Sequence, residues 1–232
     1  MSEGACYQSN DARDIGLVSL LRVAHRLFSS ASVIQALPRL VELRTREFPI
    51  AEFHELFLTL DPPFLDAFKI ATSFENLFKA ELLDFGYVVH KIDKRANARQ
   101  FEALGSQQAL RPIHVTEIRA AEGATWMRRG PFTIASLGHE TLTLGLLISE
   151  HAAYWRSLRL AKPLRDALDF VRTQRNTVHF VVNDSSRFNN QIVDWYLGLR
   201  SAMNTRLLPR YRKVIMRYPH LKSSPALALN EI

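Results

Sequence analysis

The sequence predicts an all-α protein, a helical bundle that forms a single domain over residues 1–232 with an irregular insertion in its middle. Apolar residues recur at steps of three and four over most of the chain, as in helices with one buried face. Alternating runs of β-branched residues bounded by turns, which would predict strands, are scarce. With 232 residues, 47% of them apolar and 23% charged, the chain is long enough to bury one large core.

The first half of the chain predicts three helical stretches and a short apolar piece behind a polar terminus. We expect residues 1–13 to be frayed, because they are polar. The apolar spacing then predicts helices over 14–30, 33–47 and 64–94, with a short apolar piece over 52–60. Pro38 should kink the second of these or start a new piece. Asp61, followed by two prolines, should cap the last, and Gly86 inside it should mark a bend or a close contact.

The second half begins with the insertion, residues 95–130, which is polar and rich in helix-breaking residues. Within it, only residues 113–118 look extended. Helical spacing then predicts helices over 133–160, 164–180 and 187–214, the last interrupted at Pro209. Residues 219–232 should form a loose tail.

The helix expected at Leu164–Phe180 concentrates the ionisable groups of interest. On a helix that turns about 100° per residue, Arg175 lies about 40°, His179 about 80° and Arg172 about 100° from Val171. The two arginines and the histidine therefore share one shoulder, beside the face that enters the core. Such a position holds ionisable groups half-desolvated and fixed in direction, as proton transfer next to a phosphate requires.

The same stretch resembles the signature of the HEPN superfamily, in which an Arg, often followed by a polar residue, precedes a His by four to six residues. Arg172 satisfies the spacing, with six residues between it and His179. Arg175 and Asn176 supply the Arg-polar pair, with three residues before His179, so either arginine remains a candidate for the family position. A second stretch, Phe74–Gly86, resembles the second-helix pattern of HEPN domains, a Glu followed four residues later by a Lys.

The resemblance implies a metal-independent endoribonuclease whose site forms across a homodimer, where two signature helices face each other. The candidate catalytic residues are His179, Arg175, Arg172, Asn176 and Glu75. His179 would exchange the proton of the ribose 2′-hydroxyl, and the arginines would stabilise charge on the phosphate. Such proteins act in toxin–antitoxin, phage-defence or RNA-processing systems, so a cognate antitoxin or another protein is a further expected partner.

Each of these residues also has a purely structural interpretation. His179 can be a helix-end residue bonded to a backbone carbonyl, with the arginines in solvent or paired to Asp166 and Asp169. Glu75 and Lys79 can be a stabilising i,i+4 pair on a helix surface; the functional alternative has Glu75 pointing into the bundle near the Arg-His site.

A net charge of +7 favours an anionic partner, and the charge is concentrated near the C-terminus. Seven Lys or Arg residues and no acid lie between Asp194 and Glu231. The candidate RNA-binding residues are Arg200, Arg206, Arg210, Arg212, Lys213 and Arg217, with tyrosines among them that could stack on bases. The alternative is a solvated helix face whose aromatic residues pack on the bundle. Trp126, next to two arginines in the insertion, is a candidate partner contact, whereas Trp155 and Trp195 should be core or interface residues.

Other classes of function fit poorly. The histidines show no ligand spacing with one another, and Cys6 is the sole cysteine, so we expect neither a metal site nor a cofactor. Phosphate-binding glycine loops and a nucleophile elbow are absent. No membrane span or signal peptide is evident, which favours the cytoplasm. The alternatives to a nuclease are a non-catalytic helical module that binds RNA, a nucleotide or a partner protein, and a structural domain whose basic tail meets an acidic protein.

Overall fold

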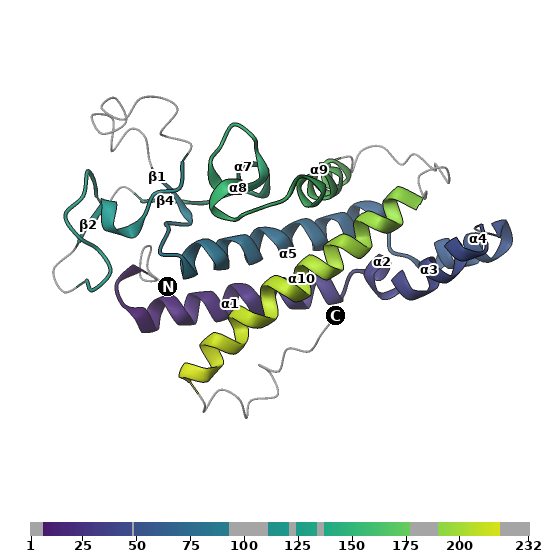
Figure 1. Cartoon of the computed structure of the whole chain (residues 1–232), viewed down its shortest axis with the longest axis horizontal. Helices are drawn as coiled ribbons and strands as arrows, with labels where there is room; N and C mark the ends of the chain where they lie inside the picture. Colours follow the sequence, from purple (N-terminus) through teal and green to yellow (C-terminus); the bar gives the residue numbers. More distant parts are fainter. Residues whose placement is uncertain are drawn as a thin grey trace.

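A computed structural model describes residues 7–47, 49–92, 111–120, 124–133, 137–176 and 190–218, and these residues are mostly helical. The helices surround one long central helix, and a small region of short strands lies at one end of it (Figure 1). The prediction of a mainly helical chain with an irregular middle is confirmed. The expected loose tail lies outside the described residues, as does much of the expected insertion.

The core forms where α1 (Asn10–Ser29) packs along the central helix α5 (Pro63–Asp84). Apolar residues of α1 at helical spacing face α5, and Phe28 meets Phe74 edge-on with ring centroids 5.8 Å apart. Phe74 in turn contacts Phe78, one turn further along α5. Edge-to-face aromatic contacts of this kind add to the free energy gained from burial alone.

The N-terminal segment is not frayed over its whole predicted range. Ser9 caps α1 by accepting a hydrogen bond from the backbone N–H of Ala12. Tyr7 is fully buried, and its hydroxyl accepts a bond from the N–H of Val89 at 2.9 Å and lies 2.7 Å from Nδ1 of His90. A single aromatic residue with a polar partner therefore anchors a segment whose composition is otherwise polar.

Between α1 and α5 the chain forms α2 (Ser32–Gln35), α3 (Leu37–Thr45) and α4 (Ile50–Thr59). The break expected near Pro38 is present, because α3 begins with this proline in its first turn. The predicted cap of α5 is wrong: Pro62 occupies that position, and Asp61 instead accepts a bond from Lys69. The buried carboxylate of Asp66 accepts bonds from the backbone N–H groups of Ser32 and Val33, so α5 caps α2 from a distance.

The helix predicted over 64–94 ends earlier, at Asp84, because Gly86 adopts a positive φ of 81°. A β-carbon at this position would also lie 2.6 Å from Nε2 of His114. Both the backbone conformation and the space available therefore favour glycine here. The chain then enters β1 (His90–Ile92), which pairs antiparallel with β4 (Leu137–Thr141).

The insertion contributes a 3₁₀ turn, η3 (Val115–Glu117), and β2 (Ile118–Arg119), which pairs in parallel with β3 (Phe132–Thr133) just after the insertion. Residues 113–118, expected to be extended, therefore contain a helical turn. Trp126 is half-buried rather than projecting: its indole N–H donates to Asn10 of α1, and the guanidinium of Arg13 stacks over its ring.

The prediction of a helix over 133–160 is wrong. This stretch contains β3's last residue, β4, and the short helices α7 (Leu144–Ile148) and α8 (Tyr154–Ser157). Pairing with β1 makes the start of this stretch a strand rather than a helix. The Leu142 N–H donates to the carbonyl of Val89 and continues the ribbon that β1 and β4 form. His139, inside the range predicted as helix, lies in β4.

Two longer helices complete the structure, α9 (Lys162–Asn176) and α10 (Asn190–Arg217). Lys162 and Pro163, expected to separate two helices, form the first turn of α9. α10 runs diagonally across the bundle (Figure 1) and contacts α1, α3, α5 and α9. The predicted interruption at Pro209 is absent, because buried residues on both sides of the proline hold α10 against the core.

A buried ion pair joins α10 to the central helix. Glu81 of α5 is 1% exposed, and its Oε2 accepts a bond of 2.7 Å from Nη1 of Arg206. Nη1 of Arg210 lies 3.4 Å from the other carboxylate oxygen. Burial raises the pKa of Glu81 despite the two arginines, so the environment disfavours the charged form relative to water.

We expect Glu81 to lower the stability of the protein as the pH rises. A carboxyl whose pKa is raised on folding contributes stability below its ordinary value of 4.5, and this contribution is lost as the pH rises through the pKa of the folded state. The Glu81→Gln variant lacks this titration. The free energy of unfolding of the variant should therefore increase relative to that of the wild type as the pH rises from acidic to neutral. Urea denaturation across this range measures the difference, and parallel profiles of the two proteins would contradict the expectation.

Candidate functional site

The helix that carries the candidate arginines, α9, is amphipathic. Ala167, Leu168 and Val171 are buried and form its inner face. Two ion pairs of helical spacing, Lys162–Asp166 and Arg172–Asp169, lie on its outer side. This confirms the predicted orientation of the helix up to Asn176, its last residue.

Arg172 lies on the shoulder of α9, with 37% of its side chain exposed. Its Nε and Nη2 both donate to Oδ1 of Asp169, at 2.9 and 2.7 Å. The stem of the side chain passes over α7: a β-carbon built on Gly145 would lie 3.6 Å from Cδ of Arg172. The guanidinium is therefore held in one direction, by a carboxylate from its own helix, and remains open to solvent.

Arg175 is also half-buried, close to the inner face of α9, as its position on the helix predicts. Asn176 is the last residue of α9. His179 lies outside the described residues, so the expected proximity of the imidazole to the arginines stays a prediction. The choice between Arg172 and Arg175 as the family position also stays open.

Glu75 does more than stabilise a helix surface. Its Oε1 accepts a bond of 2.7 Å from Lys79, as the i,i+4 spacing suggests. Its Oε2 accepts a bond of 2.8 Å from the backbone N–H of Leu144, in the first turn of α7. Lys79, which is 5% exposed, also donates to Oγ1 of Thr141 at the end of β4.

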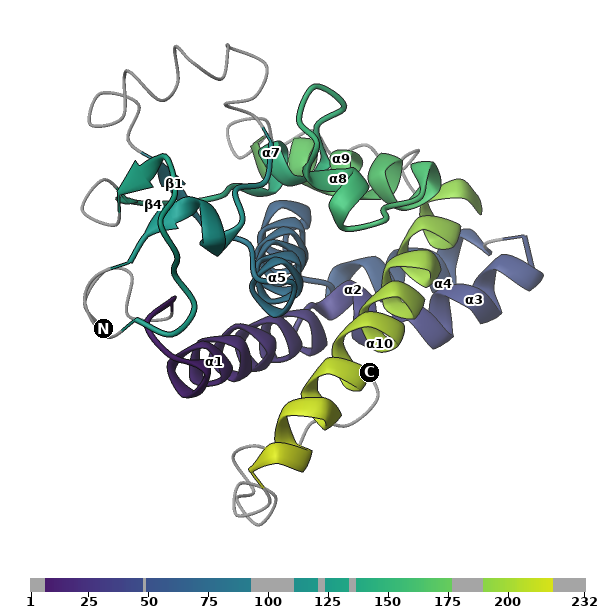
Figure 2. The same ribbon diagram turned by 60° about the vertical axis from the view of Figure 1, so that its left-hand side comes forward.

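These contacts bring Glu75 and Arg172 to neighbouring residues of the same short helix. Glu75 of α5 holds Leu144, and Arg172 of α9 lies over the next residue, Gly145. In both Figure 1 and Figure 2, α7 and α9 lie on one side of α5 and α1 lies on the other. The three helices α5, α7 and α9 contact one another in pairs and form a corner, which we call the α5–α7–α9 corner.

Four of the candidate RNA-binding cations of α10 form ion pairs with carboxylates of α1 and α5. Arg206 and Arg210 face Glu81, Lys213 binds Asp84 at 2.8 Å, and Arg217 binds the buried Asp14 at 2.9 Å. Of the remaining two candidate RNA-binding residues, Arg212 is exposed and Arg200 is half-buried. The arrangement resembles the structural alternative, in which this face of α10 packs on the bundle, more closely than an open phosphate-binding surface.

The tyrosines of α10 are also engaged. Tyr211 is buried, and the hydroxyl of Tyr218 donates to Asp11 of α1 at 2.6 Å. This bond and the neighbouring acids raise the pKa of Tyr218 to about 12. Trp195 packs against Phe170 of α9, in agreement with a core or interface role.

Residues that the sequence did not single out complete the polar contacts of the strand region. His90 and Thr141 are direct partners across the β1–β4 ribbon, so their side chains share one face of it. This face receives Lys79 at Thr141 and Tyr7 at His90. The one available signal was a large aromatic residue, Tyr7, within a polar terminal segment.

Within the described residues, no group of three or more His, Cys, Asp or Glu side chains lies close enough to hold a metal ion. None of the described helices is both long and apolar enough to cross a bilayer. No protein-family model matches the chain, and no curated protein or solved structure shows significant similarity to it.

We expect Glu75→Ala to destabilise the protein by about 1–3 kcal/mol, the usual cost of leaving buried polar groups without their partner. The substitution removes the acceptor of both the Lys79 ammonium and the Leu144 N–H. Thermal denaturation measures the effect. The matched control is Glu55→Ala, which removes an exposed carboxylate from α4 and should leave the midpoint unchanged. Equal midpoints for the two variants would contradict the role assigned to Glu75.

Proposed function

We propose that this protein is a metal-independent endoribonuclease of HEPN type. The observation that carries the proposal is the position of the half-buried Arg172 and Arg175 on one shoulder of α9, seven and four positions before His179 in the sequence. Permanent cations in a fixed direction, one short step from an imidazole, are what cleavage of RNA without a metal requires. The mainly helical fold agrees with the proposal.

In the proposed reaction, His179 takes the proton of a ribose 2′-hydroxyl or supplies the proton of the leaving group. The 2′-oxygen bonds to the adjacent phosphorus and the bond to the 5′-oxygen breaks, which leaves a 2′,3′-cyclic phosphate and a 5′-hydroxyl. Arg172 or Arg175 stabilises the negative charge that develops on the phosphate. Asn176 orients the phosphate or the imidazole.

Glu75 acts in this proposal as a positioning residue. It does not reach the substrate but holds the first turn of α7, over which the side chain of Arg172 lies. A homodimer in which two α9 helices face each other would place the four arginines and two histidines around one scissile phosphate. A toxin–antitoxin or phage-defence role in the cytoplasm, with a cognate antitoxin as partner, follows from the same resemblance and is part of the proposal.

The second candidate is a non-catalytic helical module that binds RNA, a nucleotide or a partner protein. The pairing of Arg172 with Asp169 favours it, because a carboxylate already occupies the edge of the guanidinium that would meet a phosphate. Exposed ion pairs of this kind contribute only about 0–1 kcal/mol, so an incoming phosphate can replace the carboxylate. The two candidates therefore differ in turnover rather than in affinity.

The test is cleavage of a labelled RNA by the purified protein in the presence of EDTA. We expect products ending in 2′,3′-cyclic phosphate and a loss of rate of about a hundredfold or more in His179→Ala, since general acid–base catalysis typically contributes at least this factor. The matched control is His54→Ala, which removes an exposed histidine from α4. Full activity of His179→Ala would remove the catalytic assignment, and binding without turnover would favour the second candidate.

A further inference from the structure

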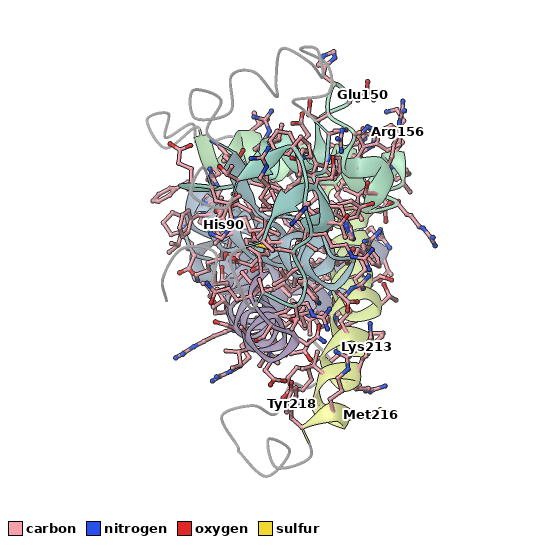
Figure 3. The ribbon with its side chains drawn as sticks, turned by 90° about the vertical axis from the view of Figure 1, so that its left-hand side faces the viewer. His90, Glu150, Arg156, Lys213, Met216 and Tyr218 are labelled. Atoms are coloured by element: carbon pink, nitrogen blue, oxygen red, sulfur yellow. The ribbon has the colours of Figure 1, made fainter. Side chains whose placement is uncertain are left out.

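A second group of cations lies on α8 and the start of α9, outside both sets of candidate residues. Between His151 and Arg165 the sequence has four cations, Arg156, Arg159, Lys162 and Arg165, and no acid. The first three are exposed, and Figure 3 shows Arg156 at the outer edge of the molecule, near Glu150. We call these four residues, together with Trp155, the α8–α9 basic surface.

Trp155 and Arg165 form the floor of this surface. The guanidinium of Arg165 lies 4.4 Å from the centre of the Trp155 ring, and that of Arg156 lies 5.3 Å from it. Among the described residues, the indole N–H of Trp155 and the Nε–H of Arg165 have no hydrogen-bond partner, and both atoms are buried. Nη1 of Arg165 forms an ion pair of 3.3 Å with Glu150, whose side chain is 73% exposed. The acid that pairs with this floor therefore lies in solvent.

The turn that presents Arg159 is held rigidly from inside the protein. Arg159 has a φ of 51°, a left-handed conformation that a residue with a side chain adopts at a cost in free energy. Nη2 of Arg206 donates to the carbonyls of Leu158 and Arg159, while its Nη1 binds the buried Glu81. The ion pair between α5 and α10 thus fixes the backbone of this turn, and the side chain of Arg159 points to solvent.

The surface continues toward the proposed catalytic shoulder. Arg165 and Arg172 are seven residues apart on α9, so they lie on the same side of the helix, about 10 Å from each other along its axis. Arg165 packs over Trp155 of α8, next to Arg156 in the sequence. Arg172 packs over Gly145 of α7. The cations therefore follow α8 and α9 up to Arg172, with Asp169, the partner of Arg172, between it and Arg165.

We propose that the α8–α9 basic surface binds the backbone of single-stranded RNA and leads it to Arg172; this rests on the endoribonuclease proposed above. Arginine forks match phosphate oxygens, and Arg156 and Arg159 are exposed, together with Lys162, on this surface. Lys162 and Arg165 pair with exposed acids, Asp166 and Glu150, which a phosphate can replace. Four cations of α10, in contrast, pair with the largely buried acids Glu81, Asp84 and Asp14. RNA contact thus shifts from α10, where the sequence predicts it, to α8 and α9.

The double variant Arg156→Gln/Arg159→Gly tests the proposal. Glycine adopts a positive φ without strain, so Arg159→Gly removes the charge and keeps the turn. The control, Arg128→Gln/Arg129→Gln, removes two exposed arginines from the segment that packs beside the N-terminus of α1, with the same change in net charge. The probe is a fluorescent 2′-O-methyl RNA of mixed sequence, which lacks the 2′-hydroxyl nucleophile and cannot be cleaved.

We expect the α8–α9 variant to bind this probe about tenfold more weakly at low salt, and the control to bind as the wild type does. The slope of log affinity against log salt should fall by about 1.4, because each phosphate contact on a single strand contributes about 0.7. Equal weakening in both variants would show an effect of net charge alone and overturn the proposal. Unchanged binding in the α8–α9 variant, or no binding by the wild type, would also overturn it.

The outcomes separate this inference from the proposed function. Binding that depends on Arg156 and Arg159 without any cleavage of ordinary RNA would retain the RNA surface and remove the nuclease. Cleavage with wild-type affinity in the α8–α9 variant would retain the nuclease and place its RNA elsewhere.

Discussion

The burial of α5 is the constraint on which the rest of the structure depends. This helix is covered along most of its length, yet it carries charged and polar side chains at the covered positions. Buried polar groups need partners, and each of these reaches a different neighbour: Asp66 caps α2, Glu75 holds α7, Lys79 binds β4, and Glu81 pairs with α10. Apolar contacts make the core, and these polar contacts determine which element lies where around it.

This arrangement links the two surfaces that matter for the proposed function. Glu75 and Glu81 lie six residues apart on α5. Each supports a surface arginine indirectly, through one other part of the protein. Glu75 positions the helix under Arg172, whereas Glu81 positions the arginine that holds the turn of Arg159. The central helix therefore supports both ends of the proposed RNA path, although none of its own side chains lies on the path.

The sequence predicts the helices whose pattern is local and misses the features that depend on distant partners. The apolar spacing of α1 and α9 is sufficient to place them, and a proline marks the break before α3. The helix expected after residue 133 fails because Leu142 pairs with Val89, a partner more than fifty residues away that no local pattern reveals. The acids that neutralise the cations of α10 lie on α1 and α5, so a charge count along α10 alone suggests an open basic face.

The candidate site also has features that the sequence predicts and features that depend on distant partners. Helical geometry predicts the shoulder of Arg172 and Arg175, and the pairing with Asp169 was one of the two interpretations left open. The bond from Leu144 to Glu75 could not be predicted, because it required knowing that α7 exists and where it starts. The Trp155–Arg165 stack joins two elements across a turn with an unusual backbone conformation, which composition does not reveal.

The buried Tyr7 has a practical consequence for producing this protein. Its ring fills part of the core and its hydroxyl contacts Val89 and His90, so the seventh residue belongs to the folded body. An expression vector designed by trimming the polar leader up to the first helical turn would delete this side chain and open a hole beneath the ribbon of β1 and β4. A cloning boundary or an affinity tag therefore belongs upstream of Tyr7.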